Sequence, residues 1–226
     1  MTSTTPFSGP STHSYADGPP RQVPGFASLH RMTTMLLAER MPVDGRILVL
    51  GAGGGLELKA LAEAQPGWTF DGVDPSADML RLAGETAAAH MARIQLHHGT
   101  IEIAPEGPFD GAVSLLTFHF IAREQRLATL QQIRRRLKPG APLVIAHISF
   151  AQTEPERSEW IARHVAFGAP VGTDPATLES ARQAIGTRLT ILAPEQEETL
   201  LREAGFAGVS LFYAGLSFRG WVAYAA

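Results

Sequence analysis

The feature that most constrains the fold is an apolar segment that runs directly into a glycine-rich turn, Arg46-Ile47-Leu48-Val49-Leu50-Gly51-Ala52-Gly53-Gly54-Gly55-Leu56-Glu57. Its apolar part predicts a buried strand, and the residues after Gly55 predict a helix. Glycines at such a turn let the backbone approach a ligand, and the start of the helix offers unpaired N–H groups and a positive dipole. The turn therefore predicts a site for a polar ligand, although a tight strand-to-helix turn also needs glycine for its geometry alone.

An acidic residue follows the glycines after about twenty residues, which is the spacing that a nucleotide-binding βαβ unit requires. The segment 67–76 reads as a second strand that ends in Asp74, where another helix begins. An acid in this place can accept hydrogen bonds from both hydroxyl groups of a ribose. Asp74 or Ser76 can also cap the following helix, and capping does not exclude ribose binding.

The spacing of the glycines separates two kinds of cofactor. A dinucleotide turn, G-x-G-x-x-G, needs its third glycine where this chain has Leu56, whereas here that glycine comes one residue earlier. The pattern G-x-G-x-G at Gly51, Gly53 and Gly55, followed by Asp74, resembles the motifs of class I S-adenosylmethionine-dependent methyltransferases. The resemblance extends to segments 109–114 and 137–145 and implies S-adenosylmethionine as the cofactor. An NAD-linked oxidoreductase is the alternative, because it shares the strand, the turn and the acid.

The order of the elements predicts an α/β fold with a Rossmann-like, doubly wound, seven-stranded sheet and a C-terminal antiparallel hairpin. Five strands near 46–51, 69–74, 93–98, 110–116 and 142–149 alternate with helical stretches. Two further strands are expected around 208–213 and 216–224, on either side of a Gly-Leu-Ser turn. Such a hairpin at the end of a parallel sheet also resembles class I methyltransferases, and a dinucleotide dehydrogenase does not predict it.

The chain divides into a leader and one domain. Residues 1–24 are rich in Ser, Thr, Pro and Gly and are expected to form a flexible leader, although Tyr15 and Arg21 are unusual in such a tail. In this enzyme class an N-terminal segment often folds over the cofactor. Residues 25–226 are expected to form a single methyltransferase domain. Its segment at about 151–193 is helical in character and too long for a simple crossover, which predicts a helical cap.

Composition limits the location and the partners of the protein. A chain of 226 residues that is 45% hydrophobic can bury a sizeable core, and no run approaches the length of a membrane span. The absence of cysteine excludes disulfides, thiolate metal sites and a thiol nucleophile. A net charge of −3 offers no broad basic surface for a nucleic acid. We therefore expect a cytoplasmic protein that acts on a small-molecule acceptor, without membrane or nucleic-acid partners.

The resemblance also implies which residues hold the cofactor. Gly51 and Gly53 approach its methionine end, Asp74 holds the ribose, and Thr100 and Ile101 flank the adenine. The full set of implied cofactor-binding residues is Gly51, Gly53, Gly55, Asp74, Pro75, Thr100, Ile101, Leu115 and Phe26. Many class I enzymes carry an acid two residues before the first glycine, and this chain has Val49 there. The methionine end must therefore be held in another way.

A closer likeness appears near both ends of the chain. Val23-Pro24-Gly25-Phe26 and the segment 200–206 are similar to the tRNA uridine-5-oxyacetate carboxymethyltransferases, which use carboxy-S-adenosylmethionine. That family has a tyrosine, an asparagine and an acid where this chain has Phe26, Leu115 and Thr100. Arg182 does match the family's carboxylate-binding arginine by its distance from Gly205, and we expect it to bind an anionic group. Because polar partners are missing, ordinary S-adenosylmethionine is preferred, with carboxymethyl transfer to tRNA and a non-catalytic S-adenosylmethionine-binding protein as alternatives.

The chemistry of methyl transfer asks for few catalytic groups. It is an in-line displacement that requires alignment and exclusion of water, and a base only if the acceptor must lose a proton. Candidate bases follow the fourth strand in the segment 116–120, where His119 is the predicted catalytic and substrate-binding residue. A histidine between phenylalanines is also often a packed core residue.

Other histidines have weaker claims. His147 and His164 are alternative bases, and His97 and His98 are neighbours on a strand and so face opposite sides of the sheet. No metal site is therefore expected. The acceptor, the methylated atom and the oligomeric state stay open.

Overall fold

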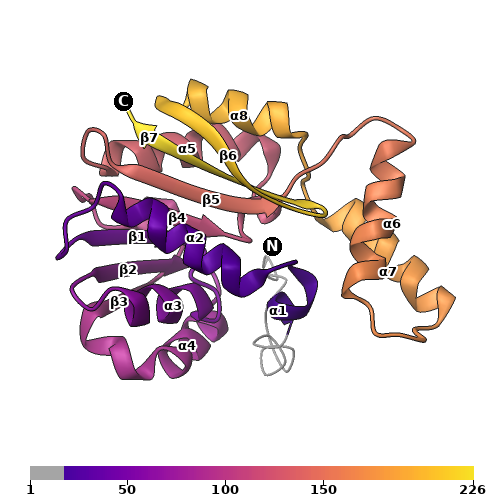
Figure 1. Ribbon diagram of the computed structural model, residues 1–226, viewed down its shortest axis with the longest axis horizontal. Helices are drawn as coiled ribbons and strands as arrows, with labels where there is room; N and C mark the ends of the chain where they lie inside the picture. The colour runs from indigo at the N-terminus through magenta and orange to yellow at the C-terminus, as the bar shows by residue number, and fades with distance from the viewer. Residues whose placement is uncertain (1–17) are drawn as a thin grey trace.

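The sheet of the computed structural model, which describes residues 18–226, has seven strands in the order β3-β2-β1-β4-β5-β7-β6 (Figure 1). The strands are β1 (Arg46–Leu50), β2 (Thr69–Asp74), β3 (Ile94–His98), β4 (Gly111–Leu115), β5 (Pro142–Ile148), β6 (Phe206–Gly215) and β7 (Phe218–Ala225). The first five are parallel, and β7 pairs antiparallel with both β5 and β6. The predicted doubly wound sheet with a C-terminal antiparallel hairpin is confirmed.

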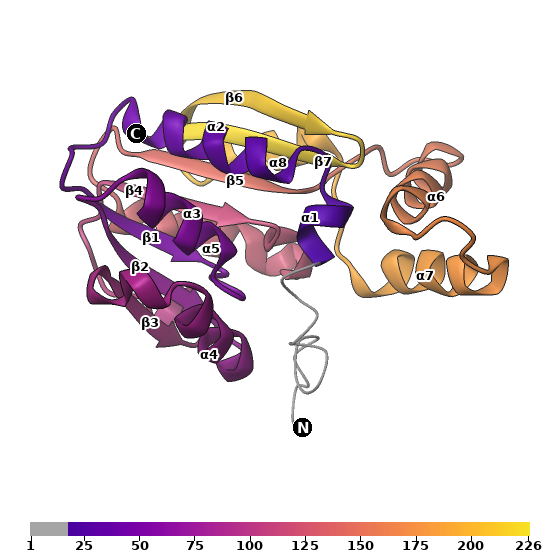
Figure 2. The same ribbon diagram turned by 60° about the horizontal axis from the view of Figure 1, so that its bottom comes forward.

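Helices cover both faces of this sheet (Figure 2). They are α1 (Gly18–Gln22), α2 (Phe26–Ala38), α3 (Leu56–Ala64), α4 (Ala77–Thr86), α5 (Arg123–Arg136), α6 (Glu156–Gly168), α7 (Pro175–Arg188) and α8 (Pro194–Glu203), with short 3-10 turns η3 (Ala88–Arg93), η4 (Ile101–Ile103) and η5 (Phe118–Phe120). Buried side chains of α2 and α3 join one core cluster, and those of α5 and α8 join the other. Within residues 18–226 no helix is long and apolar enough to cross a membrane.

The central strand β1 shows why the sheet is covered on both sides. Ile47 and Val49 pack into one core cluster, whereas Leu48 and Leu50 pack into the other. Successive side chains of a strand point to opposite faces, so a continuous apolar run requires two covered faces. The strand order reverses between β1 and β4, and ligands of such sheets bind at the C-terminal ends of the strands at this point. The glycine turn after β1 therefore emerges where a ligand is expected.

A short helix and a tight turn lead into α2. Residues 18–22 form α1, and Val23 is only 2% exposed. Gly25 begins α2 with a positive φ of 65°, and the hydroxyl of Tyr213 donates a 2.6 Å hydrogen bond to the carbonyl of Pro24. Residues 18–24 therefore contact the domain through Val23 and Pro24, and a leader that is flexible without a ligand stays a prediction. Residues 1–17, with Tyr15, lie outside the described residues.

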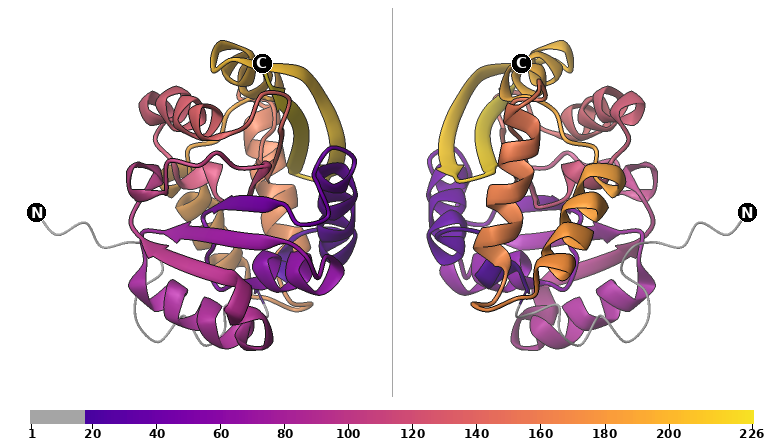
Figure 3. Two further views of the ribbon diagram at one scale, coloured as in Figure 1. Left: turned by 90° about the vertical axis from the view of Figure 1, so that its left-hand side faces the viewer. Right: turned by 90° about the vertical axis from the view of Figure 1, so that its right-hand side faces the viewer.

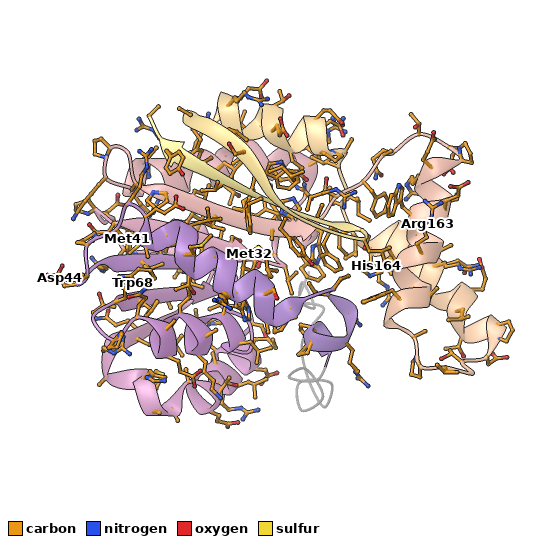
Figure 4. The ribbon with its side chains drawn as sticks, in the orientation of Figure 1. Met32, Met41, Asp44, Trp68, Arg163 and His164 are labelled. Carbon is orange, nitrogen blue, oxygen red and sulfur yellow. The ribbon has the colours of Figure 1, made fainter. Side chains whose placement is uncertain are left out.

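The predicted cap region consists of two helices, α6 and α7, that pack against each other beyond the C-terminal end of β5 (Figures 1 and 3). Nδ1 of His164 lies 2.7 Å from Oγ of Ser217, and this contact joins α6 to the turn of the β6–β7 hairpin. Figure 4 shows His164 on the side of α6 that faces the hairpin. The side chain of Asp174 satisfies the N-terminus of helix α7 by accepting a hydrogen bond from the backbone N–H of Thr177. No residue of α7 is fully buried. The region thus contains two helices, and its role as a cap that closes over a substrate stays a prediction.

Candidate functional site

The turn between β1 and α3 holds three glycines in the left-handed backbone region. Gly51, Gly53 and Gly55 have φ angles of 78°, 47° and 81°, which residues with a side chain rarely adopt. A Cβ atom on Gly51 would overlap the side chain of Thr117, and one on Gly55 would lie 2.7 Å from Cα of Ala83. Glycine is therefore required at 51 and 55 for packing.

Asp74 ends β2 beside this turn, and backbone groups fix its carboxylate. Oδ2 accepts a hydrogen bond from the N–H of Gly53 and Oδ1 accepts one from the N–H of Ser76, each at 2.9 Å. The cap of α4 is Ser76, whose hydroxyl oxygen accepts from the N–H of Met79. Burial raises the pKa of Asp74, and the two backbone hydrogen bonds partly offset this effect. A carboxylate has about four acceptor positions, so positions are left for the hydroxyl groups of a ribose.

A cavity of about 650 Å³ opens at the C-terminal ends of the central strands. One part is lined by segments that follow β1, β2 and β3, including Gly51, Gly53, Asp74, Pro75, Thr100 and Ile101. The other part is lined by the segment after β4, by α5 and by the end of α7, including Thr117, Phe120, Ile121, Glu124, Gln125 and Arg188. The volume falls within the range of about 300–1,000 Å³ that is usual for small-molecule sites.

Most of the predicted cofactor residues lie on this cavity. They are Gly51, Gly53, Asp74, Pro75, Thr100, Ile101 and Leu115. The other two are not on its lining. Gly55 packs against Ala83, and Phe26 lines a smaller adjoining cavity of about 20 Å³, with its ring edge against the ring of His30.

His119 is not among the described residues that line the large cavity. Its side chain is 5% exposed, and its Nδ1 accepts a hydrogen bond of 3.4 Å from the backbone N–H of Ile148. Burial, together with the nearby charge of His147, lowers the pKa of His119 well below its ordinary value of 6.5, so the ring is neutral. Successive residues of a 3-10 turn point about a third of a turn apart, so Phe120 reaches the cavity and His119 does not. His119 therefore does not lie on the lining of the cavity where the acceptor is expected.

Arg182 likewise does not lie on the cavity lining. Its Nη1 pairs with Oε2 of Glu179 at 3.4 Å, and its side chain is 41% exposed. The arginine on the cavity is Arg188, in the last turn of α7. Six residues of an α-helix turn through about 240°, so the two arginines lie on different sides of α7. The cavity thus brings Arg188, and not Arg182, beside the other lining residues.

Sequence reasoning also missed a buried polar network behind the acceptor side of the site. Nε2 of His147 in β5 lies 3.0 Å from Oε1 of Glu197 in α8, and the same carboxylate pairs with Arg126 of α5. Arg126 also donates to the carbonyls of Thr190 and Ile121. Burial acts to raise the pKa of Glu197, but the charges and hydrogen bonds of His147 and Arg126 outweigh it and lower the pKa. The network connects α5, β5 and α8 to the end of the cap.

Comparison with known proteins gives the class of this fold and site. Residues 47–140 match the family described as a methyltransferase domain. The carboxy-S-adenosyl-L-methionine synthase of Chromohalobacter salexigens is 27% identical over 208 residues, which cover 90% of this chain and 77% of that protein. The synthase of the same name from Aeromonas salmonicida is 24% identical over 207 residues, which cover 90% of this chain and 84% of that protein.

Solved structures agree on the fold. An S-adenosylmethionine-dependent methyltransferase from Aquifex aeolicus matches with a TM-score of 0.66 at 15% identity, over 97% of this chain and 100% of that one. Human N-acetylserotonin methyltransferase in complex with S-adenosylmethionine matches with a TM-score of 0.57 at 18% identity, over 98% of this chain. The pyocyanin biosynthetic protein PhzM matches with a TM-score of 0.64 at 19% identity, over 88% of this chain. The present chain spans 60% of the human enzyme and 55% of PhzM.

Residues 47–140 thus match a methyltransferase domain, and the chain as a whole has the Rossmann-like fold of the S-adenosylmethionine-dependent methyltransferases. S-Adenosylmethionine, the predicted cofactor, is the cofactor of this class. The curated relatives are named as synthases of carboxy-S-adenosylmethionine, the carboxylated donor of the branch that the ends of the sequence resemble. The site fits a cofactor of this type, because the buried carboxylate of Asp74 is held by backbone N–H groups on the cavity and keeps acceptor positions for a ribose.

Proposed function

We propose that the protein binds S-adenosylmethionine in the large cavity and transfers its methyl group to a small-molecule acceptor in the same cavity. The observation that carries this proposal is the continuity of the cavity, which has about 650 Å³ and is lined from Asp74 at one part to Arg188 at the other. Two ligands that must react need one shared enclosure with their reacting atoms in contact. A cavity with cofactor-binding groups at one part and different polar groups at the other meets this requirement.

The cofactor part of the cavity has a distinct role for each segment. Asp74 accepts hydrogen bonds from the ribose, while Thr100 and Ile101 lie beside the adenine. Gly51 and Gly53 present backbone without side chains, so the sulfur and the methionine part can lie close to the turn. These roles follow the class resemblance and agree with the positions of the residues on the cavity.

The acceptor part has a mixed lining. Phe120 and Ile121 offer apolar surface, and Glu124 and Arg188 offer charge. This combination supports an acceptor with an apolar body and an anionic or hydrogen-bonding group. The anionic acceptor that was expected to meet Arg182 is therefore proposed to meet Arg188 instead.

The chemical step asks the chain for alignment and a dry site. S-Adenosylmethionine, when bound, supplies a methyl group whose carbon is electrophilic because its sulfur is a sulfonium. The protein must hold the acceptor in line with that carbon and exclude water. The backbone N–H of Thr190 donates a 2.9 Å hydrogen bond to the carbonyl of His119, which fixes the end of the cap to η5 beside the acceptor part. His119 thereby acts as a positioning residue for η5 and not as the base.

Two measurements test this function. S-Adenosylhomocysteine should raise the melting temperature of the protein more than NAD does. Labelled methyl groups from S-adenosylmethionine should then appear in one of a panel of small acceptors that carry carboxylate groups. Stronger stabilisation by NAD would favour the oxidoreductase alternative. Stabilisation by S-adenosylhomocysteine without turnover of any substrate would favour the non-catalytic binding protein.

A second candidate is synthesis of carboxy-S-adenosylmethionine, which the names and the 90% coverage of the curated relatives favour. In that reaction the methyl carbon of S-adenosylmethionine loses a proton to solvent and gains a carboxyl group from a co-substrate that releases one, and the resulting carboxymethyl group stays on the sulfur. Mass spectrometry separates the two candidates, because methyl transfer yields S-adenosylhomocysteine and the synthase reaction yields a heavier, carboxylated nucleoside. Consumption of carboxy-S-adenosylmethionine in the presence of tRNA would support carboxymethyl transfer instead.

A further inference from the structure

A small cavity of about 20 Å³ adjoins the large one and shares Gly51, Leu115 and Leu116 with it. Its volume suits one water molecule or one group of similar size, such as an ammonium group. Leu116 has a positive φ of 58°, a strained conformation for a residue with a side chain and one that is common at ligand sites. A ligand in the large cavity can thus extend one small polar group into the space beyond the glycine turn.

The carboxylate of Glu57, on the first turn of α3, lines this small cavity. The residue is 7% exposed, and its Oε1 is buried without a hydrogen-bond partner among the described residues. Burial raises the pKa of Glu57 well above its ordinary value, the charge of Asp74 adds to this, and a hydrogen bond from the backbone of Leu115 opposes it. Burial of an uncompensated carboxylate is costly, so a partner is expected.

The described residues supply no cation for this carboxylate. No ion pair within 4.0 Å joins Glu57 to a lysine, arginine or histidine in residues 18–226. His30 also lines the small cavity, but burial lowers the pKa of His30 to about 4, so its ring is neutral near pH 7. Phe26, another residue that lines this cavity, is apolar, and its ring packs against the ring of His30 in an edge arrangement. Within residues 18–226, therefore, no side chain offers a positive charge to Glu57, which leaves a bound ligand as the source that we consider.

The sequence also lacks a negative charge that many enzymes of this class carry just before the glycine turn. Val49 stands where many enzymes of this class carry an acid, and it is fully buried in the core. We propose that Glu57 supplies the missing negative charge and pairs with the α-ammonium group of the methionine part of S-adenosylmethionine. This proposal rests on the proposed function, because it takes the cofactor to lie in the large cavity with its ribose on Asp74. The shared residues Gly51 and Leu116 mark the route from the sulfur to the small cavity.

Calorimetric titration of three proteins with two ligands tests the pairing. The proteins are the wild type, Glu57→Gln and the matched control Glu63→Gln, whose exposed carboxylate on the same helix pairs with Lys59 at 3.9 Å. The ligands are S-adenosylhomocysteine and 5′-methylthioadenosine, which keeps the nucleoside and the sulfur but has no amino-acid end. Loss of a charge-assisted hydrogen bond should weaken S-adenosylhomocysteine about ten- to hundredfold in Glu57→Gln. Binding of 5′-methylthioadenosine should not change, and Glu63→Gln should match the wild type for both ligands.

The possible results distinguish failure of this inference from failure of the proposed function. Wild-type protein that binds neither ligand overturns the proposed function and the inference with it. Normal binding of both ligands by Glu57→Gln overturns the inference alone. An equal loss for both ligands also overturns it, because a general distortion of the site does not distinguish the amino-acid end. The unliganded Glu57→Gln protein should melt at or above the wild-type temperature, since it no longer buries a carboxylate, and this confirms that the variant folds.

Discussion

Replacement of Asp74 by alanine should weaken cofactor binding strongly while leaving the protein folded. The side chain is 8% exposed, lies on the large cavity, and is held by two backbone hydrogen bonds of 2.9 Å. A ribose adds two hydrogen bonds to this carboxylate, each worth about 1.5–3 kcal/mol because the acceptor is charged. Water that enters the vacated space returns part of this energy, so we expect a loss of about 2–4 kcal/mol, or about 30- to 800-fold in Kd.

The effect on folding should be smaller than the effect on binding. The N–H groups of Gly53 and Ser76 lose their acceptor in Asp74→Ala, which costs about 1–3 kcal/mol for each donor that stays unsatisfied. Both donors lie next to the cavity, where water can reach them, and the variant no longer buries a carboxylate whose pKa is raised. The free energy of unfolding should therefore fall by no more than about 2 kcal/mol.

Titration of S-adenosylhomocysteine into the purified variant measures the change in Kd, and chemical denaturation measures the change in stability. Glu85→Ala is a suitable control, because Glu85 is an exposed acid on α4 that pairs only at the surface with Arg81, at 2.6 Å. If Asp74→Ala binds S-adenosylhomocysteine as tightly as the control does, the carboxylate serves only to shape the glycine turn, and the assignment of the ribose site is refuted.

Three further predictions concern the acceptor part and the buried histidines. Arg188→Leu should raise the acceptor KM about tenfold or more through loss of a charged hydrogen bond, while Arg182→Leu should leave KM unchanged; the opposite result in steady-state kinetics would restore Arg182 to the site. His119→Phe should lower the free energy of unfolding by about 1–3 kcal/mol, since the N–H of Ile148 loses its acceptor, and a pH profile of kcat that keeps its wild-type shape would confirm that the ring is not a base. The free energy of unfolding should fall on acidification below about pH 6.5, because folding lowers the pKa of His30, His119 and His164 and the unfolded chain therefore binds more protons there. Denaturation curves at pH 7 and pH 5 that coincide would contradict this prediction.

The fold was predictable because its signals are local. The apolar run 46–50, the glycine turn and the acid at 74 fall within one βαβ unit, and each depends on neighbours a few residues away. The same holds for the hairpin, whose turn at Leu216 and Ser217 lies within the Gly-Leu-Ser sequence. The contact of Pro24 with Tyr213 could not be predicted in this way, since its partner comes from the far end of the chain.

The cofactor part of the site was likewise within reach, whereas the acceptor part was not. Residues that follow strands directly, such as Asp74 and Thr100, take their place from the topology of the sheet. Arg188 reaches the cavity only because α7 returns toward the sheet at an angle that no periodicity encodes. The direction of His119 depends on one 3-10 turn, and an error of one residue there moves a side chain from the cavity to the core. The partners of His147 come from two other helices, which explains why the network left no motif.

The hydrogen bond between Tyr213 and Pro24 has a consequence for synthesis of the protein. The carbonyl of Pro24 precedes the helix whose first residues line the small cavity, and its partner hydroxyl lies 189 residues later in β6. A growing chain can build β1 to β5 and the glycine turn well before β6 has emerged from the ribosome. The start of α2, which lines the small cavity, is however held by this hydrogen bond only when the β6–β7 hairpin packs onto the sheet. The start of α2 is therefore fixed in part by the end of the chain, so a product that stops short of β6 would lack this restraint on the wall of the small cavity.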